Sequence, residues 1–222
     1  MAATLFERLK DACAVEWDAY IRHDFVRRLG AGTLAAPAFR HYLQQDYLFL
    51  IHFARAYSLA GYKADTLEDM RAAAATLSAL VDTEMSLHVK YCQGWGLSEA
   101  EMETLPEDLP TVAYTRFVLD RGMAGDLLDL QVALAPCIVG YAEVARWLVD
   151  DPATMHTGNP YGDWIEMYAG ADYQQVAQDA VETLDRLMAR RGGDGRMAGL
   201  TGTFRQATRL ETAFWQMGLD RQ

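Results

Sequence analysis

The stretch that decides the fold is residues 124–151, AGDLLDLQVALAPCIVGYAEVARWLVDD. Its middle is apolar on nearly every face of a helix, and a helix that is apolar all round is buried by its neighbours. Pro136 has no N–H to donate to the helical hydrogen-bond ladder, and it comes immediately before Cys137. The sequence therefore predicts a buried central helix with a thiol beside a proline.

Helical periodicity continues on both sides of this segment, and no alternating strand pattern or Asn-Gly hairpin interrupts it. We expect a single domain over residues 1–222, an all-α bundle around the central helix. Pro106 and Pro110 are expected to bracket a loop, and residues 190–196 form a glycine-rich break. The other predicted helices span residues 5–21, 35–64, 66–96, 111–122, 163–170 and 172–189, with a last one to about 218.

Composition narrows the class of partner. The 222 residues carry a formal charge of −11, and no Lys/Arg-rich patch interrupts this acidity, so nucleic-acid binding is not expected. The longest uncharged apolar run, Val132–Ala142, is shorter than the roughly 20 residues of a membrane-spanning helix. The N-terminus does not resemble a signal peptide, and the odd number of cysteines does not suggest a disulfide framework. We expect a cytoplasmic protein with a neutral or cationic partner.

Two carboxylates stand among aromatic residues at helical spacing. Asp46 shares a face with Tyr42 and Phe49, and Glu211 shares one with Phe214 and Trp215. A buried carboxylate needs a partner, so Asp46 either pairs with Arg55 or another base, or binds an amino group or protonated ring of a ligand. Glu211 is either a solvated helix residue or a buried acid whose raised pKa suits proton donation near neutral pH.

Cys137 and Tyr141 are four residues apart and point the same way. Most cysteines in apolar helices are inert small hydrophobes, and no charged group near Cys137 in the sequence would lower its pKa. Tyr114 and Tyr168 are either core residues with satisfied hydroxyls or polar tips in an aromatic pocket. The residues alone leave both interpretations open.

A metal site is the alternative constellation. Glu84 and His88 are four residues apart on one predicted helix, and Asp46 and Glu143 lie on predicted neighbours, as the carboxylate and histidine ligands of di-iron bundles do. Such sites usually carry two Glu-x-x-His units, and this sequence has none. We therefore expect no metal, an intrahelical pair of His88 with Glu84, and a paired structural role for Glu143.

Taken in order, several blocks resemble one family. They are HDFVRRLGAGTL, FRHYLQQDYLFLIHFARAYS, DTEMSLH, TVAYTRFV, APCIVGYAEVA, WIEMYAG and ETAFW. The set is similar to the TenA/thiaminase II family over nearly the whole chain, from about Phe6 to Trp215, and Cys137 indicates the cysteine-bearing branch of that family.

The resemblance implies a haem-oxygenase-like bundle, commonly a homotetramer, that needs no cofactor and no metal. It implies hydrolysis of 4-amino-5-aminomethyl-2-methylpyrimidine to the hydroxymethyl analogue with release of ammonia, and in many members cleavage of thiamine. By position, Cys137 would be the nucleophile and Glu211 the proton donor. The residues expected to contact the substrate are Asp46, Tyr141, Tyr168, Tyr114, Phe49 and Phe214.

Two departures from the family pattern bear on the chemistry. Phe49 stands where many members have a tyrosine whose hydroxyl lies close to the cysteine, which leaves the activation of Cys137 unexplained. The residues Ile138, Val139 and Gly140 replace bulkier side chains found in some relatives and reshape one wall. Two rival functions stay open: a di-metal oxidase using Asp46, Glu84, His88 and Glu143, and a non-enzymatic pyrimidine-binding regulatory protein.

Overall fold

The computed structural model describes residues 3–221, except for the side chains of residues 83, 84 and 87. These residues form helices and no strand, so the predicted all-α class is confirmed. The elements are α1 (Leu5–Ala12), α2 (Ala14–Ile21), α3 (Asp24–Gly30), α4 (Ala36–Lys63), α5 (Leu67–Ala79), the π-helix η1 (Leu80–Glu84), α6 (Met85–Gln93), α7 (Glu99–Glu103), α8 (Leu109–Ala124), α9 (Leu127–Asp150), α10 (Gly162–Ala169), α11 (Ala171–Arg191), the 3₁₀ helix η2 (Asp194–Arg196) and α12 (Met197–Leu219).

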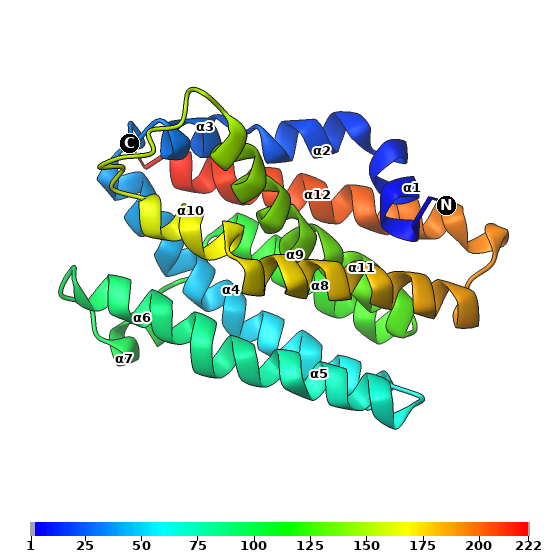
Figure 1. Ribbon diagram of the computed structural model, residues 1–222. Coiled ribbons are helices and arrows are strands. Elements are labelled where there is room, and N and C mark those ends of the chain that lie inside the picture. The colour runs from blue at the N-terminus through cyan, green and yellow to red at the C-terminus, as the bar shows by residue number, and fades with distance from the viewer. Residues whose placement is uncertain (1–2, 222) are drawn as a thin grey trace.

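Helix α9 runs through the middle of the bundle, as its apolar sequence predicts. In Figure 1, α2 and α12 lie above it, α4, α5 and α6 lie below it, and α10 and α11 cross in front. Asp126 caps the start of α9 by accepting hydrogen bonds from the backbone N–H groups of Leu128 and Asp129. The helix continues through Pro136 as one element.

The length and hydropathy of α9 are also those of a membrane-spanning helix. It is long and apolar enough to cross a membrane, with a mean hydropathy of 1.5, but 78% of the apolar window is buried inside the protein. A buried core helix passes the same test of length and composition, because lipid-facing and core-facing helices are both apolar. The surrounding helices therefore account for its hydropathy.

The predicted helix over residues 5–21 is wrong in one respect, because it breaks at Cys13. The backbone of Cys13 leaves helical geometry (φ −125°, ψ 26°), so α1 and α2 meet at an angle there. The Cys13 thiol is buried and lies 3.8 Å from the carbonyl of Thr201 on α12. The break lets α1 pack on α11 and α12 while α2 packs on α12 and α9.

Other boundaries also differ from the predictions. Pro110 does not end a loop but lies in the first turn of α8, where its missing N–H costs no hydrogen bond. The predicted helix over residues 66–96 contains the π-helix η1 between α5 and α6. The short helices α3 and α7 were not predicted. Each begins at a polar side-chain cap, His23 for α3 and Ser98 for α7.

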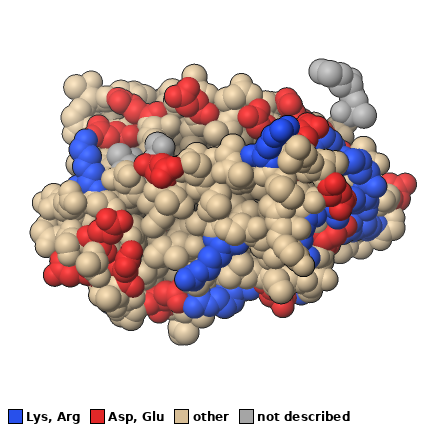
Figure 2. Space-filling view, turned by 90° about the horizontal axis from the view of Figure 1, so that it is seen from below, with Lys and Arg blue, Asp and Glu red and all other residues tan. Residues whose placement is uncertain are grey.

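The face seen from below in Figure 1 is the one that carries α5 and α6. Figure 2 shows acidic and basic side chains interspersed around a broad uncharged area on this face. Three apolar side chains on or beside α5, Leu67, Met70 and Val81, are 59%, 45% and 47% exposed. The homotetramer that the family resemblance implies stays a prediction.

Candidate active site

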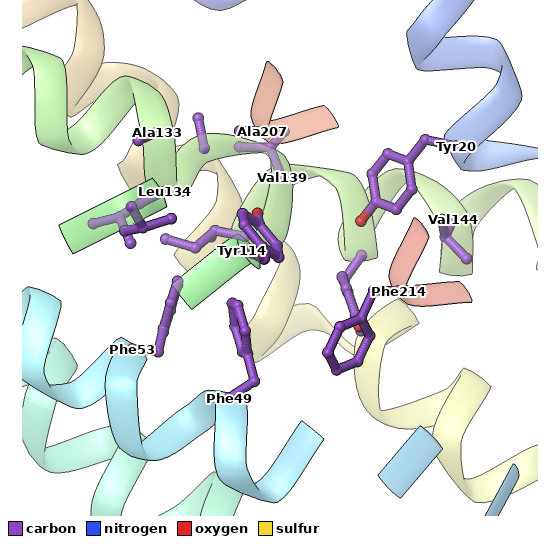
Figure 3. Packing of buried hydrophobic residues seen from close by; sticks show 14 of the residues in the cluster. Tyr20, Phe49, Phe53, Tyr114, Ala133, Leu134, Val139, Val144, Ala207 and Phe214 are labelled. Atoms are coloured by element: carbon purple, nitrogen blue, oxygen red, sulfur yellow. The ribbon is translucent and has the colours of Figure 1, made fainter. Parts of the chain in front are cut away.

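The candidate residues gather around an aromatic cage at the centre of the bundle. The cage comprises almost completely buried rings from α4, α8, α9, α10 and α12: Tyr42, Phe49, Tyr114, Tyr141, Trp164, Tyr168, Phe214 and Trp215. Figure 3 shows three of them, Phe49, Tyr114 and Phe214. A polar group in such a place is removed from water and needs a protein partner or a ligand. The cage holds two such groups from the predicted set, the carboxylates of Asp46 and Glu211, and the partly exposed Cys137 packs against the same core.

Asp46 lies on the buried face of α4 and is 4% exposed. Its Oδ2 is 2.7 Å from Nε2 of His88 on α6 and 3.3 Å from the hydroxyl of Tyr42. The base that pairs with Asp46 is therefore His88 and not Arg55, whose guanidinium lies 3.0 Å from the ring of His52. Both contacts are made by Oδ2 of Asp46, and a carboxylate has two oxygens that can accept hydrogen bonds.

Tyr42 links Asp46 to the wall of the cage. Its hydroxyl lies 3.3 Å from the hydroxyl of Tyr141 on α9, and Nε1 of Trp164 on α10 donates to it over 3.4 Å. Burial raises the pKa of Tyr141 well above its usual value, and the neighbouring Tyr42, Asp46 and Glu211 add to the effect. Tyr141 therefore stays a neutral phenol that can donate a hydrogen bond.

Glu211 lies on α12 and is 2% exposed. Its Oε1 accepts a hydrogen bond of 2.8 Å from the hydroxyl of Tyr114 on α8. Burial raises the pKa of Glu211 to about 8, the bond from Tyr114 acts in the opposite direction, and the charge of Asp46 raises the pKa further. The carboxyl group is therefore mostly protonated at neutral pH and can serve as an acid.

Cys137 lies on α9 one turn before Tyr141 and is partly exposed, unlike Cys13 and Cys92, which are buried. Charges at Cys137 and at Glu211 both raise the pKa values of Tyr20 and Tyr114, behind the larger effect of burial. The thiol, the acid and these two phenols thus share one electrostatic environment.

The apolar walls come from the remaining predicted residues. Phe49 packs against Tyr114 with ring centroids 5.0 Å apart and against Phe214 at 5.8 Å. Tyr168 packs against Tyr141 at 4.9 Å. The structure thus brings all eight predicted site residues into one connected cluster, while their roles stay predictions.

Sequence reasoning missed three members of the cluster: Tyr42, His88 and Trp164. Tyr42 is four residues before Asp46, so helical spacing does indicate that the two side chains meet. His88 was expected to pair with Glu84 along its own helix. Its Nε2 bonds Asp46 on α4, and the predicted pair with Glu84 stays a prediction because the side chain of Glu84 lies outside the described residues. No sequence signal identifies Trp164, which comes from α10.

The alternative metal site is only partly assembled. Asp46 and His88 meet, but Glu143 points to the opposite side of α9, where it accepts hydrogen bonds of 2.9 Å from Lys10 and from Nε1 of Trp17. Among residues 3–221, apart from the undescribed side chains, no three His, Cys, Asp or Glu side chains are grouped as metal ligands would be. Glu143 has the paired structural role that its position predicts.

Two hollows lie away from the cage. One, of about 320 Å³, is formed by α4, α5, α9 and α11 and is lined by residues such as Tyr57, Gln131 and Ile138. The other, of about 640 Å³, is a surface depression beside Arg40, His41 and Trp95. Asp46, Cys137 and Glu211 line neither of them, so the candidate chemistry belongs to the packed aromatic cage.

Comparison with known proteins identifies the family of this chain. The TENA/THI-4/PQQC family model matches residues 11–221. An uncharacterized protein of Haemophilus influenzae is 42% identical over 97% of this chain and 99% of its own length. The aminopyrimidine aminohydrolase of Halalkalibacterium halodurans is 33% identical, with 100% of this chain and 96% of that protein covered.

A solved structure has the same fold. The crystal structure of a TenA family transcription regulator from Silicibacter sp. TM1040 superimposes with a TM-score of 0.92 and 45% sequence identity, covering 98% of this chain and 97% of that one. The family model spans nearly the whole chain. The two relatives and the solved Silicibacter structure are also matched over almost their full lengths. This chain belongs to the TENA/THI-4/PQQC family.

Proposed function

We propose that this protein is an aminopyrimidine aminohydrolase of thiamine salvage. In this proposal it converts 4-amino-5-aminomethyl-2-methylpyrimidine and water to the 5-hydroxymethyl analogue and ammonia, and it also accepts thiamine, whose thiazole half then takes the place of ammonia as the leaving group. Support comes from the relative named aminopyrimidine aminohydrolase, which is matched over the full chain. The acidic protein also suits a substrate whose aminomethyl group is cationic at neutral pH.

The observation that carries the proposal is the buried pair of Glu211 and Tyr114 in the same cage as Cys137 and Asp46. Addition of a thiol to a pyrimidine ring breaks its aromaticity and places negative charge on a ring nitrogen, so an acid must be at hand. Glu211, with a pKa of about 8, holds a proton at neutral pH that it can give to this nitrogen.

The first half of the reaction removes the leaving group. The sulfur of Cys137 forms a bond to a ring carbon, Glu211 protonates the ring nitrogen, and the thiol proton returns to the carboxylate of Glu211. The ring then expels ammonia from the exocyclic methylene, and the departing nitrogen takes the proton that Glu211 gave to the ring nitrogen.

The second half adds water and releases the product. Water adds at the exocyclic methylene, its proton passes to the ring system, and the C–S bond breaks to regenerate the thiol. Asp46, held by His88 and Tyr42, orients the ring by accepting from its amino group, and the aromatic walls exclude bulk water.

The test is ammonia release from a panel of aminopyrimidines and thiamine by the purified protein and by Cys137→Ser. Cys92→Ala is the matched control, because Cys92 is a buried thiol that packs in a separate small cluster with Tyr47, Leu48 and Met102. We expect turnover by the wild type and by Cys92→Ala, and none detectable by Cys137→Ser. Near-wild-type turnover by Cys137→Ser would contradict the assignment of Cys137 as the nucleophile. Pyrimidine binding by a wild-type protein that releases no ammonia favours a non-enzymatic role.

A further inference from the structure

Tyr20 lies directly against the turn of α9 that carries the thiol. It projects from α2 toward α9 (Figure 3), it is fully buried, and its hydroxyl donates to the carbonyl of Pro136 over 3.2 Å. Pro136 is the residue before Cys137. The hydroxyl therefore sits one residue from the sulfur-bearing position, on a helix that the sequence leaves without a charged neighbour for the thiol.

Gly140 makes this approach possible. A Cβ atom at residue 140 would lie 2.6 Å from the Tyr20 hydroxyl and 2.4 Å from Cε1 of its ring, closer than real Cβ contacts come. Any other residue at position 140 would force Tyr20 away from the helix. Tyr20 on α2 and Gly140 on α9 thus fit together and place a phenol against Pro136 and Gly140, on the turn of α9 that carries Cys137.

The hydrogen bond that Tyr20 now makes can be redirected. Its acceptor is a neutral carbonyl, and within an α-helix that carbonyl already accepts from the N–H four residues ahead. A thiolate is a charged acceptor, and charge-assisted hydrogen bonds are roughly twice as strong as neutral ones. Tyr114 is committed to the carboxyl group of Glu211 at 2.8 Å. Tyr20 donates only to a neutral backbone carbonyl, so its hydrogen bond can move to a charged acceptor.

We propose that Tyr20 is the residue that supports ionisation of Cys137, by turning its hydroxyl from the Pro136 carbonyl to the sulfur as the thiolate forms. The phenol keeps its own proton throughout, and the thiol proton leaves by the route given above. This role supplies the hydroxyl that Phe49 lacks. The contribution of Tyr20 to turnover rests on the proposed function. Its effect on the pKa of the Cys137 thiol does not, because that effect exists without any substrate.

The experiment measures the rate of alkylation of Cys137 by iodoacetamide as a function of pH, read by mass spectrometry of the Cys137 peptide. Cys13 and Cys92 are internal controls, because burial raises the pKa of Cys13 and raises that of Cys92 to about 11. Tyr20→Phe keeps the ring that packs on Trp17 and Trp215 and removes only the hydroxyl. Tyr161→Phe is the matched control, since its buried hydroxyl also donates to a backbone carbonyl, that of Leu34.

We expect the alkylation midpoint of Cys137 in Tyr20→Phe to rise by about one pH unit, so that the thiolate fraction at neutral pH falls roughly tenfold, with a similar loss in kcat/KM. Tyr161→Phe leaves the midpoint unchanged. Gly140→Ala, which displaces the hydroxyl, gives the same shift, and combining it with Tyr20→Phe adds no further shift. Thermal unfolding confirms that each variant is folded.

An alkylation midpoint in Tyr20→Phe equal to that in Tyr161→Phe overturns the inference. If Cys137→Ser abolishes hydrolysis at the same time, the proposed function survives without it. If the midpoint shifts as expected but the wild type releases no ammonia, the role of Tyr20 stands and the proposed function falls.

Discussion

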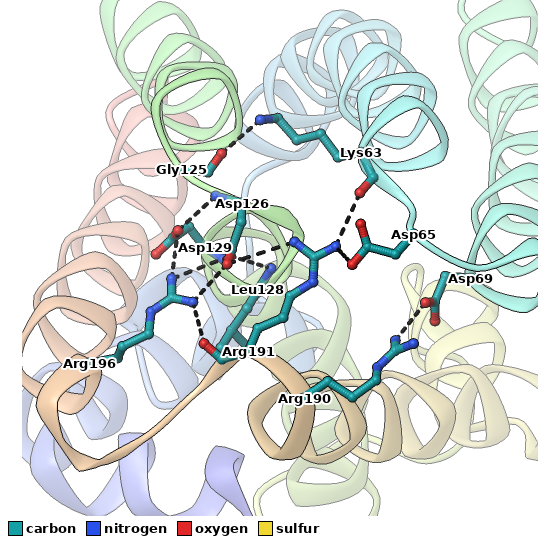
Figure 4. Close-up of polar contacts among 10 residues, drawn as sticks. All are labelled: Lys63, Asp65, Asp69, Gly125, Asp126, Leu128, Asp129, Arg190, Arg191 and Arg196. Atoms are coloured by element: carbon teal, nitrogen blue, oxygen red, sulfur yellow. Dashed lines mark hydrogen bonds and ion pairs between the residues drawn. The ribbon is translucent and has the colours of Figure 1, made fainter.

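Carboxylates occupy two contrasting regions of this bundle. At one end, around the α8–α9 turn, Asp126 and Asp129 lie 2.8 and 2.7 Å from the guanidinium of Arg196, in a network that continues through Arg191 to Asp65 (Figure 4). In the aromatic cage, Glu211 has the phenol of Tyr114 as its hydrogen-bond donor. Glu211 is fully buried whereas Asp126 and Asp129 are only partly buried, and the two regions also give their carboxyl groups partners of different kinds.

The partners determine the direction of the pKa shift. Burial acts to raise the pKa of Asp126, but hydrogen bonds from Arg196 and from backbone N–H groups outweigh it, so the pKa is lowered. At Glu211 burial is again the largest effect, and the bond from Tyr114 does not outweigh it, so the pKa rises to about 8. The guanidinium of Arg196 thus keeps the carboxyl group of Asp126 ionised. The phenol of Tyr114 leaves Glu211 as a carboxyl group that can gain or lose a proton near neutral pH.

The largest expected effect is on turnover. Glu211→Gln keeps the shape of the side chain but removes the exchangeable proton, so we expect kcat to fall by roughly 10²–10⁴-fold with little change in substrate affinity. In the wild type the acid is lost as pH rises through about 8, so kcat should fall on the alkaline side with that midpoint.

Steady-state kinetics against pH measure both effects. Glu143→Gln is the matched control, because Glu143 is a partly buried glutamate that pairs with Lys10 outside the cage. Equal losses in Glu211→Gln and Glu143→Gln, or an equal loss of affinity and kcat in Glu211→Gln, would argue against a proton donor.

A smaller effect, on stability, is expected from the ion pairs at the α8–α9 turn. Arg196→Met removes the guanidinium nearest to Asp126 and Asp129, and Asp126 keeps only a longer contact of 3.8 Å with Arg191. We expect the free energy of unfolding to fall by about 1–2 kcal/mol, less than for a fully buried pair because these groups are about a quarter to a third exposed. Turnover should be unchanged. Arg8→Met is the control, since Arg8 makes only an exposed contact of 3.8 Å with Asp194.

Urea unfolding at several pH values measures this difference. Asp126 has a lowered pKa in the folded protein, so its stabilisation is present at neutral pH and is lost as pH falls through that pKa. The gap between wild type and Arg196→Met should therefore narrow in acid. A difference in unfolding free energy that does not change with pH, or an equal loss of stability in Arg8→Met, would mean that the ion pairs do not stabilise the α8–α9 turn.

The sequence was most informative where one helix carries its own signal. The apolar pattern of residues 124–151 predicts the buried α9, and spacing along single helices predicts that Tyr42 meets Asp46 and that Cys137 meets Tyr141. The break at Cys13 was not predictable, because it is caused by packing against α11 and α12 and not by a proline or glycine.

The features of the fold and the site that the sequence did not predict depend on contacts between distant segments. His88 pairs with Asp46 on a different helix, because α6 lies against α4. The fit of Tyr20 to Gly140 joins α2 to α9, and neither residue is unusual in its local sequence. The resemblance to a family identified the eight candidate residues, but it did not indicate how this chain supplies a hydroxyl to the thiol.

The account depends most on the protonation state of Glu211, and infrared difference spectroscopy of the wild type against Glu211→Gln measures it directly. We predict a C=O stretching band of a protonated carboxylic acid at pH 7 that is absent in the variant and titrates away with a midpoint near pH 8. The absence of that band at pH 7, with a titration near the ordinary value of 4.5, would contradict the account.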